Sequence, residues 1–186
     1  MPLNLRIITG STRPGRVGPI VSDWVHSLAS TRDGFETQIL DLVEFNLPLL
    51  DEPAHPAMQQ YQHEHTRRWS GSVAAADAFI FVVPEYDFFP SAAVINAVQA
   101  LYREWGRKPA GVVSYGGVSG GLRSSQVLRS LLSNVNAHAL PQVVPIPFVS
   151  TLIQDGKLSA NAQMVDGMNS LLEELEISAK ALKVAR

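Results

Sequence analysis

The sequence predicts an α/β protein, a three-layer α/β/α sandwich around a five-stranded parallel sheet of strand order 2-1-3-4-5. Short apolar runs of strand length alternate with stretches of helical periodicity, as in parallel sheets joined by helical crossovers. The run Ala78–Val83 is apolar throughout, which is typical of a strand buried on both faces. With only five strands, the order 2-1-3-4-5 is the expected one.

The elements follow from these patterns in chain order. The expected strands are Leu5–Thr9, Thr37–Leu42, Ala78–Val83, Gly111–Tyr115 and Gln142–Ile146. The expected helices cover about Val17–Ala29, Ala57–Ala75, Ser91–Trp105 and Leu122–Asn136. A last helix is indicated by one apolar face formed by Ala160, Met164, Met168, Leu171, Leu172, Leu175, Ala179 and Leu182. Since no repeat or change of composition interrupts the pattern, we expect a single domain over residues 1–186.

Composition narrows the class of function. The formal net charge of -2 gives no general attraction to nucleic acid or anionic lipid, so neither partner is expected. No apolar run approaches the ~18 residues of a membrane span, and no signal-peptide pattern precedes the first strand, which favours the cytoplasm. The chain contains no cysteine, so any redox chemistry requires a bound organic cofactor.

Three unusual segments follow the first, third and fourth strands. They read GSTRPGR from Gly10, PEYDFFP from Pro84 and SYGGVSGG from Ser114. Ligands of open α/β sheets bind beyond the carboxyl ends of the strands, where the strand order reverses. Because strands 1, 3 and 4 are neighbours in the expected order, the three loops should form one continuous rim.

The first loop predicts a phosphate site. Unpaired N–H groups at the start of the following helix, together with the helix dipole, favour an anion there. Ser11 and Thr12 add hydroxyl donors, and Arg13 and Arg16 add positive charge. The alternative is a solvent-exposed turn with two surface arginines.

Two other nucleotide motifs fit this stretch poorly. A P-loop is excluded because no Gly-Lys-Ser/Thr ending is present. A dinucleotide-binding fold would use an acid near Asp41, but the G-x-G-x-x-G spacing is absent, and hydroxyls with paired arginines suit a terminal monophosphate. Asp41 is therefore interpreted as a strand-end residue.

The second and third loops suit a flat heteroaromatic ring. Tyr86, Phe88 and Phe89 offer aromatic surface, although Phe89 could equally pack against the next helix. Four glycines between Gly116 and Gly121 let a planar ring lie against the backbone, although a strand-to-helix turn could also require some of them.

Together, the stretches GSTRPGRVG, PEYD with Asn96, and KPAGVVSYGGVSGGLR resemble the NADPH-dependent FMN reductase family, flavodoxin-like flavoproteins that include quinone, azo-dye and chromate reductases. The resemblance implies FMN as cofactor and NADPH or NADH as co-substrate. It implies that the FMN phosphate is held by Ser11, Arg13, Arg16, Val17 and Gly18. It implies that the ribityl chain and ring are lined by Pro84, Glu85, Tyr86, Asp87 and Phe88, and covered by Ser114, Tyr115, Gly116 and Gly117.

The resemblance also implies a homodimer or homotetramer with the helix Ser91–Trp105 near the interface. Val94, Val98 and Leu101 form an apolar ridge on that helix, which could equally pack on its own sheet. Departures from the family pattern concentrate in one loop, where Asp87 replaces an asparagine and Phe89 a small residue. An ionised aspartate cannot donate a hydrogen bond, so these changes bear on ring binding more than on phosphate binding.

The sequence thus favours an FMN-dependent NAD(P)H oxidoreductase that works by ping-pong hydride transfer to a small-molecule acceptor such as a quinone, an azo compound or free flavin. No catalytic side chain is assigned, because the cofactor carries the electrons. The alternative is a flavodoxin-like binding or regulatory protein that has lost efficient flavin chemistry, and Asp87 and Phe89 keep it open.

Two other motifs, a possible nucleophilic serine and a histidine pair, are interpreted as non-functional. Ser119 lacks the G-x-S-x-G spacing of a nucleophile elbow and is interpreted as a loop serine. His63 and His65 lie two positions apart on the expected helix and should point to different sides, so no metal site is expected there.

Overall fold

The computed structural model describes residues 1–186 and contains a parallel sheet of five strands in the order β2-β1-β3-β4-β5. The strands are β1 Leu3–Thr9, β2 Phe35–Asp41, β3 Ala78–Pro84, β4 Pro109–Tyr115 and β5 His138–Ile146. The predicted three-layer architecture and flavodoxin-like strand order are confirmed. Four strands begin earlier than predicted, most clearly β5, an edge strand that contains Pro141 and shifts register beside it.

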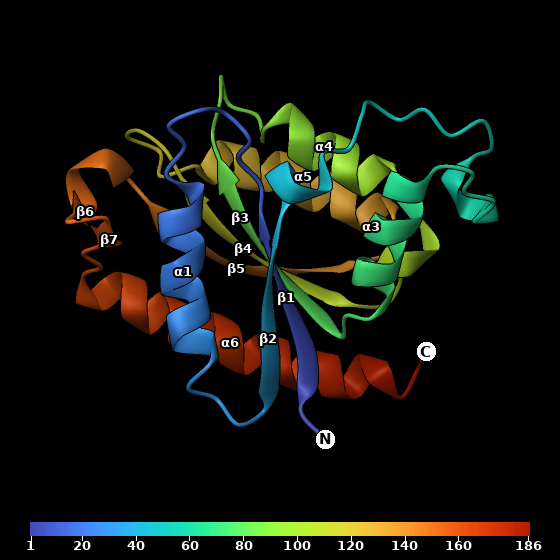
Figure 1. The fold of residues 1–186 in the computed structure, drawn as a ribbon. Helices are drawn as coiled ribbons and strands as arrows, with labels where there is room; N and C mark the ends of the chain where they lie inside the picture. The colour runs from blue at the N-terminus through green and yellow to red at the C-terminus, as the bar shows by residue number, and fades with distance from the viewer.

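Six helices accompany the sheet. They are α1 Gly18–Ala29, α2 Leu42–Phe45, α3 Glu64–Ala74, α4 Ala92–Gln99, α5 Leu122–Asn134 and α6 Ala162–Lys183. Helices α1 and α6 cover one face of the sheet, and α3, α4 and α5 cover the other (Figure 1). None of the helices combines the length and the apolar character that crossing a bilayer requires.

Two helices are shorter than predicted by a turn or more. The expected helix from Ala57 begins only at Glu64, because Gln59 has a φ of 53° and ends a 3-10 turn. The Glu52 carboxylate then accepts the N–H groups of Gln62 and His63, which holds them outside the helix. The expected helix Ser91–Trp105 covers only Ala92–Gln99, and a separate 3-10 turn, Arg103–Trp105, follows after a break.

A small antiparallel hairpin follows the sheet and was not predicted. Its strands are β6 Ile153–Gln154 and β7 Lys157–Leu158. Both turn residues, Asp155 and Gly156, have positive φ, at 48° and 74°. Asp-Gly is a preferred sequence for such two-residue turns, and it is the signal that could have located this hairpin.

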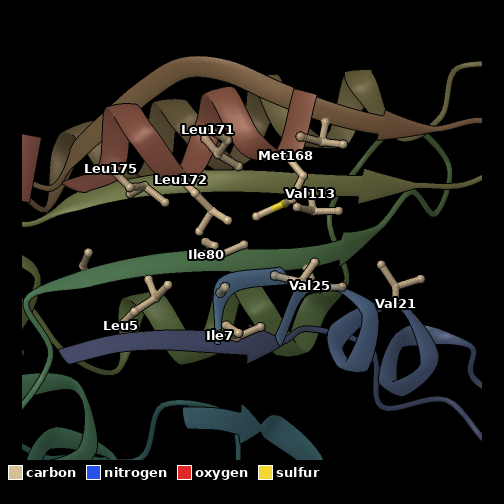
Figure 2. Close-up of a cluster of buried hydrophobic side chains, with 14 of the residues drawn as sticks. Leu5, Ile7, Val21, Val25, Ile80, Val113, Met168, Leu171, Leu172 and Leu175 are labelled. Atoms are coloured by element: carbon tan, nitrogen blue, oxygen red, sulfur yellow. The ribbon is translucent and has the colours of Figure 1, made fainter. Parts of the chain in front are cut away.

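Two apolar cores lie on the two faces of the sheet. Figure 2 shows the core under α1 and α6, where Leu5, Ile7 and Ile80 face Leu172 across the interior. On the opposite face, the large side chains are aromatic and include Phe79, Phe81, Trp69 and Trp105. Successive residues of β3 alternate between these two cores, which is why its sequence is apolar without interruption.

The apolar ridge of α4 belongs to the second of these cores. Val94 and Val98 are fully buried, and Leu101 is 1% exposed. The ridge therefore packs on its own sheet, so its apolar character gives no indication of a contact between subunits.

Both ends of the chain lie at the amino ends of the strands, away from the loops that follow β1, β3 and β4 (Figure 1). The C-terminal Arg186 donates to the carbonyl oxygens of Ala76 and Asp77, immediately before β3. Lys183 of α6 donates to the Asp77 carboxylate at 2.8 Å, and the Asn4 N–H donates to the same carboxylate at 3.1 Å.

Candidate active site

The three unusual loops meet at the carboxyl edge of the sheet, as the strand order predicts. The Ser91 hydroxyl donates to the carbonyl of Gly10 and so joins the loop after β3 to the end of β1. The Arg13 guanidinium lies 5.7 Å from the centre of the Tyr86 ring. The loop after β4 contacts the loop after β3 through Ser119, whose hydroxyl lies 2.7 Å from the Glu85 carboxylate. One rim therefore contains all three segments.

The first loop presents unpaired backbone donors. The N–H groups that donate to no protein atom in this stretch are those of Ser11, Thr12, Arg13, Gly15 and Val17. They immediately precede α1, whose N-cap residue Val17 supplies no side-chain hydrogen bond. Such a run of free donors at a helix start suits an anion.

Two buried hydroxyls beside this loop also lack partners. Ser11 Oγ and Tyr115 OH are inaccessible to solvent and, apart from each other, have no hydrogen-bond partner in the protein. Both surround Gly18, where a Cβ atom would lie 2.1 Å from Ser11 Oγ and 2.8 Å from Tyr115 OH. Burial raises the pKa of Tyr115 to about 12, so its hydroxyl stays protonated and can donate. Unsatisfied buried hydroxyls are costly, and a bound phosphate would satisfy them.

The two arginines of this loop have different surroundings. Arg16 donates from Nη1 to Asp41 at 2.6 Å and from Nη2 to the same carboxylate at 2.7 Å. Its Nη1 also donates to the carbonyl of Ser11 at 2.6 Å, so Arg16 links the loop to the end of β2. The hydrogen bond to Asp41 raises the pKa of Arg16 further. Arg13 is exposed and makes no ion pair, which leaves its charge available to a ligand.

Asp41 has two roles that were not predicted. It ends β2, as interpreted from the sequence, and its carboxylate also accepts the Val43 N–H at 3.0 Å as the N-cap of α2. The same carboxylate holds Arg16 in place. Nothing in the sequence identifies this pairing, because the two residues lie 25 positions apart and meet only in the folded sheet.

The loop after β3 is a tight hairpin. Tyr86 and Phe89 exchange two backbone hydrogen bonds of 2.9 Å, and Asp87 and Phe88 between them have φ values of 49° and 75°. This is the pattern of a type I′ turn, in which a bulky residue such as Phe88 is strained. The N–H groups of Asp87 and Phe88 donate to no protein atom, so they remain available at the rim.

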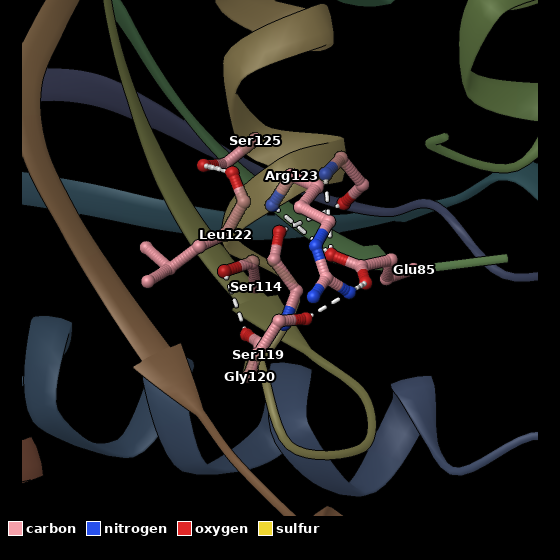
Figure 3. A network of polar contacts seen from close by, with 9 residues as sticks. Glu85, Ser114, Ser119, Gly120, Leu122, Arg123 and Ser125 are labelled. Atoms are coloured by element: carbon pink, nitrogen blue, oxygen red, sulfur yellow. Dashed lines mark hydrogen bonds and ion pairs between the residues drawn. The ribbon is translucent and has the colours of Figure 1, made fainter. Parts of the chain in front are cut away.

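The hairpin exposes its aromatic side chains. Phe88 is 59% exposed and Phe89 is 55% exposed, while Tyr86 is 37% exposed. The alternative that Phe89 packs against the following helix is therefore wrong. Pro84 is buried at the end of β3, and the Glu85 carboxylate points toward the start of α5 (Figure 3).

The glycine-rich loop divides into two halves. Gly120 and Gly121 have φ values of 60° and 84°, and a Cβ at Gly121 would lie 2.6 Å from the Tyr115 nitrogen, so these two glycines form the turn itself. Gly117 is exposed and has open space around it, so it can approach a ligand. The Ser114 hydroxyl donates to the Gly120 carbonyl at 2.9 Å inside the protein. The side chains of Ser114 and Tyr115 are thus internal, and of the four predicted residues Ser114–Gly117 only the backbone of Gly116 and Gly117 reaches the rim.

The histidine pair lies away from this rim. His63 precedes the first residue of α3, and its ring stacks on that of His65 with centroids 5.2 Å apart. The prediction that these side chains point to different sides is therefore wrong, because only His65 is helical. His65 Nε2 lies 3.0 Å from Asp51 Oδ1, and both rings contact that carboxylate.

Comparison with known proteins finds FMN reductases both by family model and by sequence identity. The sequence model described as NADPH-dependent FMN reductase matches residues 3–151. The chain is 38% identical over 170 residues to the NAD(P)H-dependent FMN reductase ntnL of Nectria sp, covering 86% of this chain and 85% of that protein. It is 39% identical over 151 residues to an NAD(P)H-dependent FMN reductase of Schizosaccharomyces pombe, covering 80% and 73%.

The fold also has a close counterpart among solved structures. The flavoenzyme NAD(P)H:(acceptor) oxidoreductase FerB from Paracoccus denitrificans superposes with a TM-score of 0.75, covering 96% of this chain and 98% of that one. At 18% sequence identity, this likeness concerns the fold.

Proposed function

Because the chain belongs to the NADPH-dependent FMN reductase family and is a flavin-dependent oxidoreductase that uses NAD(P)H, we propose that it binds FMN at the rim formed by the three loops and reduces a small-molecule acceptor there. The observation that carries this proposal is the pair of buried, unpartnered hydroxyls of Ser11 and Tyr115 beside a helix start with free N–H groups.

At the phosphate end, the donors are already in place. The free N–H groups between Ser11 and Val17 and the two buried hydroxyls would donate to the phosphate oxygens. The absence of a Cβ at Gly18 lets both hydroxyls lie close to the start of α1. Arg13 would supply the free positive charge, and Arg16 would keep the loop attached to β2.

At the ring end, the protein supplies backbone donors and apolar surface. The free N–H groups of Asp87, Phe88 and Gly117 would donate to ring heteroatoms and stabilise negative charge on them. The exposed apolar side chains of Phe88, Phe89 and Val118 would exclude water and contact a planar acceptor, together with that of Phe148, whose N–H donates to the Gly117 carbonyl. No side chain has to act as a nucleophile or a general base.

FMN held by these residues would supply hydride chemistry between NADPH or NADH and the acceptor, in what we propose is a ping-pong cycle. We propose a quinone, an azo compound or free flavin as acceptor, because the rim is open and apolar. We further propose a homodimer or homotetramer in which a second copy packs near the exposed aromatic hairpin, as such a surface favours association.

The experiment is a flavin titration followed by steady-state kinetics. Purified protein should be yellow or become yellow with FMN, and should oxidise NADPH when a quinone is supplied. Double-reciprocal plots at several quinone concentrations should be parallel, and the mass in solution should be a multiple of the chain mass. Colourless protein that does not bind FMN would instead support a binding or regulatory protein, for which Asp87 and Phe89 are the relevant departures from the family pattern.

A further inference from the structure

Glu85 joins two loops that line the proposed ring site. Its carboxylate accepts the Ser119 hydroxyl at 2.7 Å, the Arg123 N–H at 3.0 Å and the Ser124 N–H at 3.4 Å (Figure 3). Glu85 itself begins the hairpin after β3, whereas Ser119 lies in the middle of the glycine-rich loop after β4. One side chain therefore connects segments that are 34 residues apart in sequence.

The carboxylate is held as an anion inside the protein. The Glu85 side chain is only 9% exposed. Burial raises the pKa of such a group, but the hydrogen bonds from Ser119, Ser124 and Arg123 outweigh burial and hold the pKa below its usual value. Charge-assisted hydrogen bonds of this kind are stronger than those between neutral groups, so the connection is stiff.

A third connection runs through Arg123 to the tip of the hairpin. Arg123 Nη1 donates to Glu85 Oε1 at 3.1 Å, and its guanidinium lies 4.2 Å from the centre of the Phe88 ring. Phe88 keeps a φ of 75°, a strained conformation for a bulky residue that persists only when the surroundings hold it. The carboxylate, the guanidinium and the ring thus fix the hairpin tip relative to α5.

The backbone donors of the ring site lie on these two loops. Asp87 and Phe88 offer free N–H groups on the hairpin, and Gly117 offers one on the glycine-rich loop. Neither loop has a backbone hydrogen bond to the other beyond the one from Glu85 N–H to the Tyr115 carbonyl. The Glu85 side chain is therefore the main polar connection that keeps the two sets of donors in register.

We propose that Glu85 is a positioning residue: its carboxylate sets the spacing between the hairpin after β3 and the glycine-rich loop, and thereby orders the donors that hold the flavin ring. This inference rests on the proposed function. In this proposal, the Glu85 side chain binds Ser119 and the start of α5 and does not contact FMN directly.

The rival explanation is that Glu85 only caps α5. The N-cap residue Gly121 provides no side-chain acceptor, so Glu85 supplies the acceptor for the first N–H groups of α5. Ser119 separates the two explanations. Its hydroxyl donates to Glu85 and accepts the Gly121 N–H at 3.2 Å, but it makes no contact with the Arg123 and Ser124 N–H groups that Glu85 caps.

The test compares Glu85→Gln and Ser119→Ala with the matched control Glu52→Gln. Glu52 also accepts two backbone N–H groups, from Gln62 and His63, and braces a loop outside the proposed site. For each protein, the measurements are the dissociation constants of FMN and riboflavin, the visible circular dichroism of the bound flavin, and hydrogen exchange of the loop amides without flavin.

We expect Glu85→Gln to weaken FMN and riboflavin by the same factor, roughly tenfold, because the amide replaces a charged acceptor by a group that partly donates. Ser119→Ala should weaken both ligands by a smaller common factor. Both variants should change the visible circular dichroism of the bound flavin and speed amide exchange in the two loops. Glu52→Gln should leave the flavin affinities, the circular dichroism and the exchange rates of these loops unchanged.

Wild-type affinity and circular dichroism in Ser119→Ala, combined with a lowered melting temperature alone in Glu85→Gln, would overturn the inference in favour of a cap. If Glu85→Gln fails to fold, Ser119→Ala still decides between the two explanations. Wild-type protein that binds neither FMN nor riboflavin would contradict the proposed function itself and remove the basis of the inference.

Discussion

Arg13 and Arg16 stand three residues apart in one loop, yet their guanidinium groups meet different surroundings. Arg16 is mostly buried and forms a two-point ion pair with Asp41, whereas Arg13 faces solvent near the Tyr86 ring. The sequence gives both arginines the same role, since residue type and spacing say nothing of a partner 25 positions away. The unpartnered Tyr115 hydroxyl is a second donor that the sequence assigns to the ring end and the structure places beside Ser11 and Gly18.

This difference predicts separable effects of two substitutions. Arg13→Ala should weaken FMN by about tenfold and leave riboflavin nearly unchanged, because only FMN carries the phosphate that a free guanidinium would bind. Arg16→Ala should weaken FMN and also lower the melting temperature, since it detaches the loop from β2. Flavin fluorescence titrations and thermal unfolding measure both quantities. Equal losses of FMN and riboflavin affinity in Arg13→Ala would contradict the phosphate role of that residue.

Among the elements, those with a clear apolar period were predictable. The five strands and their order follow from the alternation of short apolar runs with helical stretches, and from the rule that parallel strands are linked by crossovers. The failures occur where local contacts compete with the helical period, as at Gln59 and at the end of α4. The break after Gln99 leads to Trp105, whose ring nitrogen donates back to the Val98 carbonyl at 3.1 Å. Such a tertiary hydrogen bond has no sequence signature.

The contact between α6 and the start of β3 predicts a dependence of stability on pH. Burial raises the pKa of Asp77, but hydrogen bonds from Lys183 and the Asn4 N–H outweigh it and lower the pKa below its ordinary value. A carboxylate with a lowered pKa stabilises the fold above its unfolded-state pKa of about 3.9, and this contribution is lost as the pH falls through the folded-state pKa.

Asp77→Asn should therefore lower the free energy of unfolding at neutral pH by about 1 kcal/mol, and the difference from wild type should disappear in acid. Urea unfolding at a series of pH values between neutral and acid measures it. Glu173→Gln, an exposed position on the same helix, serves as the control and should follow the wild-type curve. A difference that persists at the lowest pH would contradict the assignment to the Asp77 charge.

At the scale of the whole molecule, the sheet is stabilised by burial on both faces. Helix α6 runs along one face and contributes Met168, Leu171 and Leu172 to the core in Figure 2. The predicted apolar face of this helix is confirmed, except that Ala160 lies before its first residue and Leu182 is only partly buried. The helical periodicity of the apolar residues is enough to predict the buried face of α6, because a helix buries its apolar stripe against the core.

Leu172→Ala should reduce the free energy of unfolding by roughly 2–5 kcal/mol, because the side chain is fully buried and its loss leaves a cavity. Ile177→Ala on the same helix, at a position that is 58% exposed, should change it by less than about 0.5 kcal/mol. Chemical denaturation of the two variants gives both values. Similar losses in the two variants would mean that α6 does not pack on the sheet as described.

The meeting of three loops at one edge of the sheet was predictable from strand order alone, since neighbouring parallel strands end side by side. What could not be predicted is how each side chain is used there. Glu85 turns away from the rim, Ser114 and Tyr115 turn inward, and Phe89 turns outward. These orientations depend on partners brought in by other elements, among them Ser119 and Arg123.

The position of the two chain ends, at the amino ends of the strands, has a practical consequence (Figure 1). An affinity tag, a fluorophore or a linker to an electrode attached at Met1 or Arg186 would project from the side of the molecule opposite the rim. Immobilised protein would then present its rim to the solution in a uniform orientation, which suits electrochemical detection of acceptors.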